Sequence, residues 1–215
     1  MRMHINSDQL AIHRTVVLTS VRVVDTVTSS DLAGPTPCAG WTLTDLLAHM
    51  TVQHRGFAAA ARGHGADLNQ WDPATVADAV AADPGGTYAD AAADVLDAFA
   101  APGVLEASFV LPEMGPGATF PGSTAIAFHF IDYIAHGWDV ARSLGRPFAL
   151  PDDVVAAALP LVLAVPDGDF REAAGSPFGR AVPVGAPGGA LDRILGHLGR
   201  SPAWTATAST GRGVD

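Results

Sequence analysis

Two histidines and two aspartates lie within one apolar stretch of the chain, FHFIDYIAHGWD, which runs from Phe128 to Asp139. Apolar residues recur around this stretch at helical spacing, so we expect a helix. On a helix, Asp132 and His136 lie about 40° apart around the axis and one turn apart along it. One carboxylate and one imidazole on the same face can bind a metal ion, but a useful site needs a third ligand from elsewhere.

A third ligand is offered by the segment LTDLLAHMTVQHRGF, where His49 lies within an apolar helical pattern. His54 follows five residues later, about 140° around the helix, so the two histidines do not easily face one ion. Pairs such as D-x-x-x-H are common by chance, and a histidine flanked by apolar residues is often a hydrogen-bonded core residue. Spacing alone therefore leaves two interpretations open: a metal site at His49, Asp132 and His136, or a set of core residues.

The other polar residues of the same stretch have simpler interpretations. His129, three residues before Asp132, lies on the same face and either packs there or holds the Asp132 carboxylate. Trp138 is expected in the core or in a pocket wall. Asp139 is expected to accept a hydrogen bond from a neighbouring helix or from Arg142. The pattern assigns no role to the remaining histidines, which are His4, His13, His54, His64 and His197.

The composition narrows the class of protein. Twelve arginines and no lysines stand against 22 acidic residues, and the resulting net charge of -10 argues against nucleic-acid binding. The single cysteine, Cys38, excludes an intramolecular disulfide, and in the loop GPTPCAGW it is more simply an ordinary loop residue than a nucleophile. The chain shows no signal-peptide pattern and no run of about twenty apolar residues. We therefore expect a cytoplasmic protein that does not contact membranes.

Helical periodicity and capping signals predict an all-α fold. Long helices are expected at 7–27, 43–62, 87–101 and 123–144, and shorter ones after Pro73, at 152–164 and at 189–198. The expected N-caps of the second and third long helices are Thr42, paired with Asp45, and Thr87. Residues 104–120 are expected to form an extended excursion or hairpin that could cover a site. One domain is expected to span residues 1–204, followed by a disordered tail at 205–215.

Three segments resemble one known family. TPCAGWTLTDLLAHM is similar to an opening pattern TPC-x-x-W-x-x-x-x-L-x-x-H, and HFIDYIAHGWDVARSLG is similar to H-x-x-D-x-x-x-H-x-W-D-L-A-x-x-x-G. FGRAVPVGAPGGALDRILGHLGRSPAW is similar to the closing segment of the same group. These patterns are those of actinobacterial metal-binding proteins of the DinB-like superfamily, which are related to mycothiol-dependent maleylpyruvate isomerase. The matches run in a consistent order from Leu10 to Trp204.

The resemblance implies a DinB-like four-helix bundle with short extra helices and a small extended or hairpin insertion. It also implies a divalent metal ion bound by His49, Asp132 and His136. Zn²⁺ with one open position suits this ligand set best, and Ni²⁺ and Fe²⁺ are alternatives. Members of the superfamily are associated with mycothiol and other low-molecular-weight thiols, and a metal ion lowers the pKa of a thiol that binds it.

The function expected from the resemblance is that of a divalent-metal-dependent enzyme of the thiol S-transferase or isomerase kind, with secondary metabolism as one setting. His129 is expected to orient a ligand or relay a proton. An apolar substrate pocket is expected to be lined by Trp41, Phe130, Tyr133 and Trp138. The expected partner is a small-molecule substrate, and a homodimer is one option for the assembly. The alternatives are a metal-dependent lyase, cyclase or hydrolase, a non-haem-iron oxygenase acting on a natural-product intermediate, and a non-catalytic small-molecule-binding or resistance protein.

Overall fold

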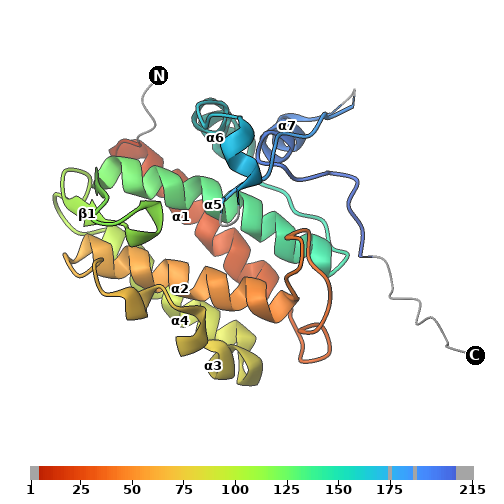
Figure 1. Cartoon of the computed structure of the whole chain (residues 1–215), viewed down its shortest axis with the longest axis horizontal. Coiled ribbons are helices and arrows are strands. Elements are labelled where there is room, and N and C mark those ends of the chain that lie inside the picture. The colour runs from red at the N-terminus through yellow and green to blue at the C-terminus, as the bar shows by residue number, and fades with distance from the viewer. Residues whose placement is uncertain (1–4, 174–175, 186–187, 207–215) are drawn as a thin grey trace, which may run out of the picture.

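The computed structural model describes residues 5–173, 176–185 and 188–206. Within this part of the chain, the long helices are α1 (Ser7–Val24), α2 (Leu43–Ala61), α4 (Pro84–Phe99) and α5 (Gly122–Ser143) (Figure 1). Shorter helices are α3 (Ala77–Ala82), α6 (Asp152–Leu163) and α7 (Ala190–His197), with 3-10 turns η1 (Leu68–Gln70), η2 (Pro73–Thr75), η3 (Pro112–Met114) and η4 (Asp169–Glu172). The two short strands are β1 (Ser108–Val110) and β2 (Thr119–Pro121). The predicted all-α bundle with a hairpin insertion is confirmed. Most of the expected tail, residues 207–215, lies outside the described residues.

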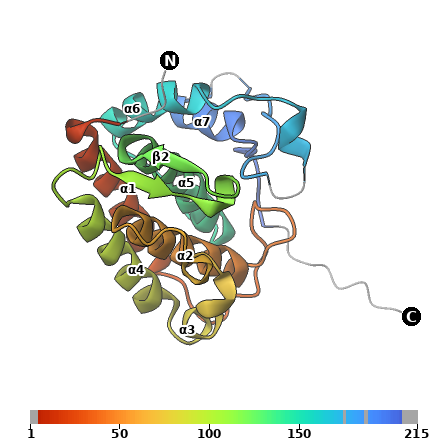
Figure 2. The same cartoon turned by 60° about the vertical axis from the view of Figure 1, so that its left-hand side comes forward.

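The helices are stacked in three tiers (Figures 1 and 2). α2 packs against α4 and α5, and α1 packs against α5 and α4, so these four helices enclose one core. α6 and α7 pack against each other, and α6 also contacts α1 and α5. They cover the side of α5 that lies away from α2, and α5 is consequently enclosed on both sides.

The N-terminal caps explain where two of the long helices begin. Thr42 caps α2, and its side chain and that of Asp45 exchange hydrogen bonds with each other's backbone, as the sequence predicts. The predicted cap of α4 at Thr87 is wrong. α4 begins at Pro84, and its cap is Asp83, whose side chain accepts a hydrogen bond from the backbone of Gly86. Proline suits this first helical position because its fixed φ matches the helix and it has no N–H to leave unpaired.

The insertion between α4 and α5 is a small antiparallel hairpin, in which Phe109 pairs with Phe120. The predicted excursion at 104–120 is confirmed in this form. Gly122, the first residue of α5, donates a backbone hydrogen bond to Ala107. A Cβ atom at Gly122 would lie only 1.8 Å from the carbonyl oxygen of Val104, so glycine is what lets the hairpin close against the start of α5.

α5 is buried along almost its whole length. Its buried residues include Ala125, Ile126, Ala127, His129, Phe130, Ile131, Tyr133, Ile134, Ala135, His136, Gly137, Trp138, Asp139, Val140 and Ala141. Each large apolar side chain buried there contributes about 1.5–3 kcal/mol to folding. Polar side chains in such a place must find internal partners, because a buried polar group without a hydrogen bond is costly. The partners of His129, His136 and Asp139 therefore define the polar interior of this protein.

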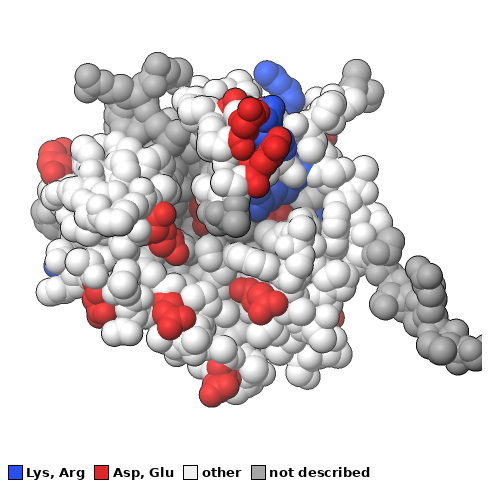
Figure 3. All heavy atoms as spheres, in the orientation of Figure 1, with Lys and Arg blue, Asp and Glu red and all other residues white. Residues whose placement is uncertain are grey.

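The surface carries the negative charge that the composition predicts. On the face in Figure 3, acidic side chains lie scattered, and basic atoms near the top lie beside acidic ones. Arg180, for example, forms ion pairs with Asp167, Asp169 and Glu172. Across the part of the chain that the structure describes, no helix has both the length and the apolar character needed to cross a membrane.

Candidate metal centre

α2 and α5 bring together the three ligands that the sequence analysis singles out. One ligand atom each from His49, Asp132 and His136 lies within 4.8 Å of the other two. The Nε2 atom of His136 is 3.3 Å from Oδ1 of Asp132, and the rings of His49 and His136 have centroids 5.1 Å apart in an edge-on arrangement. His136 is buried, whereas His49 and Asp132 are partly exposed. Two imidazoles and one carboxylate, of which His49 and Asp132 reach solvent, fit Zn²⁺ with a coordination position left for another ligand.

The charges in this group favour a proton on His136. Burial is the largest single influence and lowers the pKa of this ring, but the Asp132 carboxylate and the hydrogen bonds to Asp132, Asp139 and Cys38 together outweigh it, so the pKa is well above its ordinary value. Burial and the neighbouring His136 lower the pKa of His49 to about 4. Burial raises the pKa of Asp132, but His136 and His49 more than offset it and the net shift is downward. A metal ion bound to Nε2 of His136 would displace the proton that the raised pKa favours there.

The other nitrogen of His136 is held from the opposite side. Its Nδ1 atom lies 3.0 Å from Oδ2 of Asp139, a carboxylate that is fully buried. The same carboxylate oxygen is 3.1 Å from a guanidinium nitrogen of Arg200 and accepts a hydrogen bond from the Cys38 thiol at 3.3 Å. A histidine that donates Nδ1–H to a carboxylate presents the lone pair of Nε2, which is the usual arrangement behind a metal-binding imidazole.

A second group, Cys38, His136 and Asp139, also has ligand atoms within 4.8 Å of one another. Arg200 makes this group a poor cation site, because its guanidinium bonds to Asp139 and lies 3.7 Å from the Cys38 sulfur. A metal ion placed there would be repelled by this fixed positive charge. The group formed by His49, Asp132 and His136 is therefore the better candidate.

The exposed side of the site is bordered by an aromatic ring and a carboxylate. The ring of Trp41 lies 5.0 Å from that of His49 and is 38% exposed. Gln53, one turn beyond His49 on α2, donates a hydrogen bond of 2.7 Å to Glu113 in η3 of the hairpin. Burial raises the pKa of Glu113, and repulsion from Asp132 adds to this effect. The sequence predicts that residues 104–120 could cover a site, but nothing in their pattern singles out Glu113.

The other three aromatic residues expected in a substrate pocket are buried. Phe130, Tyr133 and Trp138 are at most 4% exposed. The hydroxyl of Tyr133 donates to the backbone carbonyl of Met50, and the guanidinium of Arg142 lies over the Trp138 ring at 5.4 Å. Of the four residues expected to line the pocket, only Trp41 offers an exposed ring beside the candidate ligands.

His129 belongs to a chain of histidines in the core. Its Nδ1 atom is 2.9 Å from Nε2 of His13 on α1, and its Nε2 atom is 3.1 Å from Nδ1 of His54 on α2. The ring of Tyr133 stacks on both His129 and His54. Burial lowers the pKa of all three histidines, to about 3 for His13, so they are neutral at ordinary pH. Both nitrogens of His129 are thus engaged within the core.

The sequence pattern assigns no role to His13 and His54, although their spacing carries a signal. His13 is three residues from Leu10 and four from Val17, and His54 is four residues from Met50. These spacings place both histidines on the inward faces of their helices. What they bond to depends on how α1, α2 and α5 pack, which spacing within one helix does not reveal.

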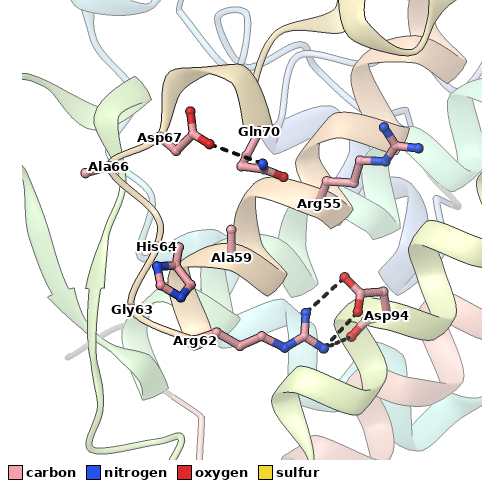
Figure 4. A pocket seen from close by; sticks show the side chains of 9 residues that line it. All are labelled: Arg55, Ala59, Arg62, Gly63, His64, Ala66, Asp67, Gln70 and Asp94. Atoms are coloured by element: carbon pink, nitrogen blue, oxygen red, sulfur yellow. Dashed lines mark hydrogen bonds and ion pairs between the residues drawn. The ribbon is translucent and has the colours of Figure 1, made fainter.

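A surface pocket of about 760 Å³ lies on another face of α2 (Figure 4). Its lining residues are Arg55, Ala59, Arg62, Gly63, His64, Ala66, Asp67, Gln70 and Asp94. Arg62 forms ion pairs with Asp94 and Asp97 at 2.8 and 3.4 Å, so its charge is already balanced. None of the three candidate ligands lines this pocket, and the candidate metal site is therefore separate from it.

Comparisons with known proteins agree with this architecture. The family model described as "Mycothiol maleylpyruvate isomerase N-terminal domain" matches residues 14–141. Uncharacterized proteins from two strains of Mycobacterium tuberculosis are each 28% identical over 199 residues, which cover 90% of this chain and 98% of the relative. The crystal structure of the mycothiol-dependent maleylpyruvate isomerase superposes with a TM-score of 0.57 at 15% identity, over 73% of this chain and 67% of that chain. At this identity, the structural likeness concerns the fold.

Proposed function

The chain belongs to the family of the mycothiol maleylpyruvate isomerase N-terminal domain, and from this premise we propose that it is a metal-dependent enzyme that uses a thiol of the mycothiol type. The reaction would be an isomerisation or an S-transfer on a small molecule. The observation that carries this proposal is the convergence of His49, Asp132 and His136 from two helices on one partly exposed point. Family membership supports the thiol, and the ligand set supports the metal.

The donor set suits Zn²⁺, with Ni²⁺ or Fe²⁺ as alternatives, because it combines two neutral imidazoles with one carboxylate. When bound, such an ion lowers the pKa of a thiol in its open position, so that thiolate is available at neutral pH. Thiolate is the nucleophilic form of a thiol. This is the chemistry that an isomerase or transferase dependent on a thiol requires.

Individual side chains would have different roles in binding the metal ion and the substrate. His49 and Asp132 would bind the ion from the exposed side, and His136 would bind it through Nε2 while its Nδ1 proton stays with Asp139. The exposed ring of Trp41 would form an apolar wall beside His49 against which a substrate could pack. Substrate and thiol would enter from the side on which Trp41 lies.

Metal content tests the first half of the proposal. Gently purified full-length protein should contain about one equivalent of a divalent metal by elemental analysis. His49→Ala and His136→Ala should each lose most of it, because two protein ligands bind a divalent ion far more weakly than three. His64→Ala, which removes an exposed histidine away from the site, is the matched control and should keep its metal. Wild-type protein that neither contains nor takes up metal would refute the proposed site.

Thiol binding tests the second half separately. Metal-loaded protein should bind mycothiol in a calorimetric titration, and the same titration with His136→Ala should show little heat. N-acetylcysteine serves as a simpler thiol to separate recognition of the sulfur from recognition of the rest of the molecule. A loaded protein that binds neither compound would retain the metal centre but lose its assignment to thiol chemistry.

A further inference from the structure

Arg200 reaches the metal centre from outside the four-helix bundle. It follows α7, which ends at His197, and the chain turns at Gly199, whose φ of 80° is left-handed. The turn directs Arg200 back toward α5, where its side chain is almost completely buried at 8% exposure. One guanidinium nitrogen donates to the backbone carbonyl of Leu198 at 2.9 Å, which fixes the side chain in this direction.

The partner of Arg200 is the buried carboxylate of Asp139. Nη2 of Arg200 lies 3.1 Å from Oδ2 of Asp139, and Nε lies 3.4 and 3.5 Å from the two carboxylate oxygens. A carboxylate that is 0% exposed would be very unfavourable without a positive partner. Burial raises the pKa of Asp139, but Arg200 and His136 together outweigh burial and hold the pKa below its ordinary value.

Asp139, held by Arg200, also contacts His136. One carboxylate oxygen, Oδ2, is shared between Nη2 of Arg200 and Nδ1 of His136, at 3.1 and 3.0 Å. Arg200 thus contacts one side of the carboxylate, and the same carboxylate contacts the imidazole. The result is that Nε2 of His136 points toward Asp132, 3.3 Å away. Arg200 therefore acts on the candidate ligand without touching it.

The Arg200–Asp139 ion pair could serve only to attach the segment that follows α7 to α5. A second side chain, however, already makes such an attachment. Arg142, one turn beyond Asp139, lies over the Trp138 ring and donates to the carbonyl of Pro202. It holds the same segment, and among the described residues it forms no side-chain hydrogen bond or ion pair with Asp139. The additional feature of Arg200 is its connection to His136.

We propose that Arg200 and Asp139 are positioning residues of the metal centre, so that the segment following α7 is a functional part of the site. This inference rests on the proposed metal binding at His49, Asp132 and His136. It goes beyond that proposal because it makes the affinity for the ion depend on a residue that is not a ligand and that comes from outside the bundle.

The test compares substitutions of Arg200 and Arg142, the two arginines that attach this segment to α5, in the full-length protein. Zn²⁺ affinity, measured by competition with a chromophoric chelator, should fall about 10–100-fold in Arg200→Met, the usual loss when the partner of a metal-binding histidine is disturbed. In Arg142→Met, by contrast, the Zn²⁺ affinity should stay within about threefold of the wild-type value, because this arginine has no hydrogen bond to the partner of a ligand. Melting temperatures measured in parallel should fall in both variants, since each loses one attachment of the C-terminal segment. Arg200→Lys should recover part of the affinity because it restores the charge but not the forked geometry.

The outcomes separate the inference from the proposed function. Equal zinc affinity in wild type, Arg200→Met and Arg142→Met, or an equal loss in both variants, would overturn the positioning role while leaving the metal site intact. Failure of the wild type to bind zinc would overturn the metal site and this inference with it. Asp139→Asn, if it folds, should lose affinity as Arg200→Met does. If it does not fold, the comparison of the two arginines still decides.

Discussion

At the scale of single residues, histidines in this protein occupy two different environments. His136 lies beside the carboxylates of Asp132 and Asp139, which raise its pKa. His129 forms side-chain hydrogen bonds to His13 and His54 in an apolar core, and burial there lowers the pKa of all three. Hydrogen bonding among neutral imidazoles works because one nitrogen of each ring donates and the other accepts. The same residue type therefore occurs beside carboxylates in the candidate metal site and as a neutral, hydrogen-bonded group in the apolar core.

The core histidines predict how stability depends on pH. In the unfolded chain each histidine takes up a proton near pH 6.5, whereas in the folded protein His13 does so only near pH 3 and the other two well below 6.5. The unfolded state thus binds more protons below about pH 6.5. The free energy of unfolding should decrease with falling pH there, by up to about 1.4 kcal/mol per pH unit for each histidine. Urea unfolding at pH 7 and pH 5 measures this difference.

A single substitution can show whether the core histidines cause this pH dependence of stability. His13→Phe removes one histidine and keeps an aromatic ring beside Phe99 and Phe130, which His13 contacts. It should lower stability at pH 7, since His129 loses a partner, yet it should flatten the decline between pH 6.5 and pH 5. The control His64→Asn changes an exposed histidine and should alter neither quantity. An unchanged slope in His13→Phe would show that the acid sensitivity has another origin.

At the scale of elements, the start of α4 shows how local chemistry can mislead. The sequence PGGT contains a proline and two glycines, which favour a break, and so Thr87 is the expected cap. The helix instead begins earlier, because Asp83 caps it and Pro84 fits its first position. The glycines extend the first turn of the helix.

The identity of the α4 cap can be tested by comparing the stability lost in two alanine variants. Asp83→Ala should destabilise the protein by about 1 kcal/mol, the usual loss for an N-cap side chain. Thr87→Ala should change stability by less than about 0.5 kcal/mol, because Thr87 lies inside the helix and its exposed hydroxyl bonds only to the backbone of Ala79. Chemical denaturation of the two variants gives the comparison. A larger loss for Thr87→Ala would instead indicate that the helix starts where the sequence suggested.

At the scale of the whole molecule, helix positions could be predicted and contacts between helices could not. Periodicity located the four long helices, and spacing with the family resemblance singled out His49, Asp132 and His136, which the fold brings together. The bonds of Asp139 with Arg200 and of His13 with His129 join residues 61 and 116 positions apart. Such pairs depend on how the tiers stack. The periodicity of one helix shows which face is buried, but not which residue lies opposite.

Zinc should stabilise the whole fold if the ion binds only the native arrangement. At a free concentration about 100 times its Kd, a ligand of this kind adds about 2.7 kcal/mol. For a chain of this size that corresponds to roughly 5–10 °C in melting temperature. Thermal unfolding of the wild type with zinc and with a chelator should show this shift, and His49→Ala should not. A shift of equal size in His49→Ala would point to binding elsewhere on the protein.

The three candidate ligands come from α2 and α5, so an ion bound between them would cross-link two helices that are far apart in the sequence. The chain contains one cysteine, so no disulfide can link its helices to one another. An ion shared by His49, Asp132 and His136 would join two distant parts of the sequence in the way a disulfide does, and restrict the unfolded chain if it stayed bound. Unlike a disulfide, such a cross-link withstands a reducing environment, and it can be removed by acid or by a chelator.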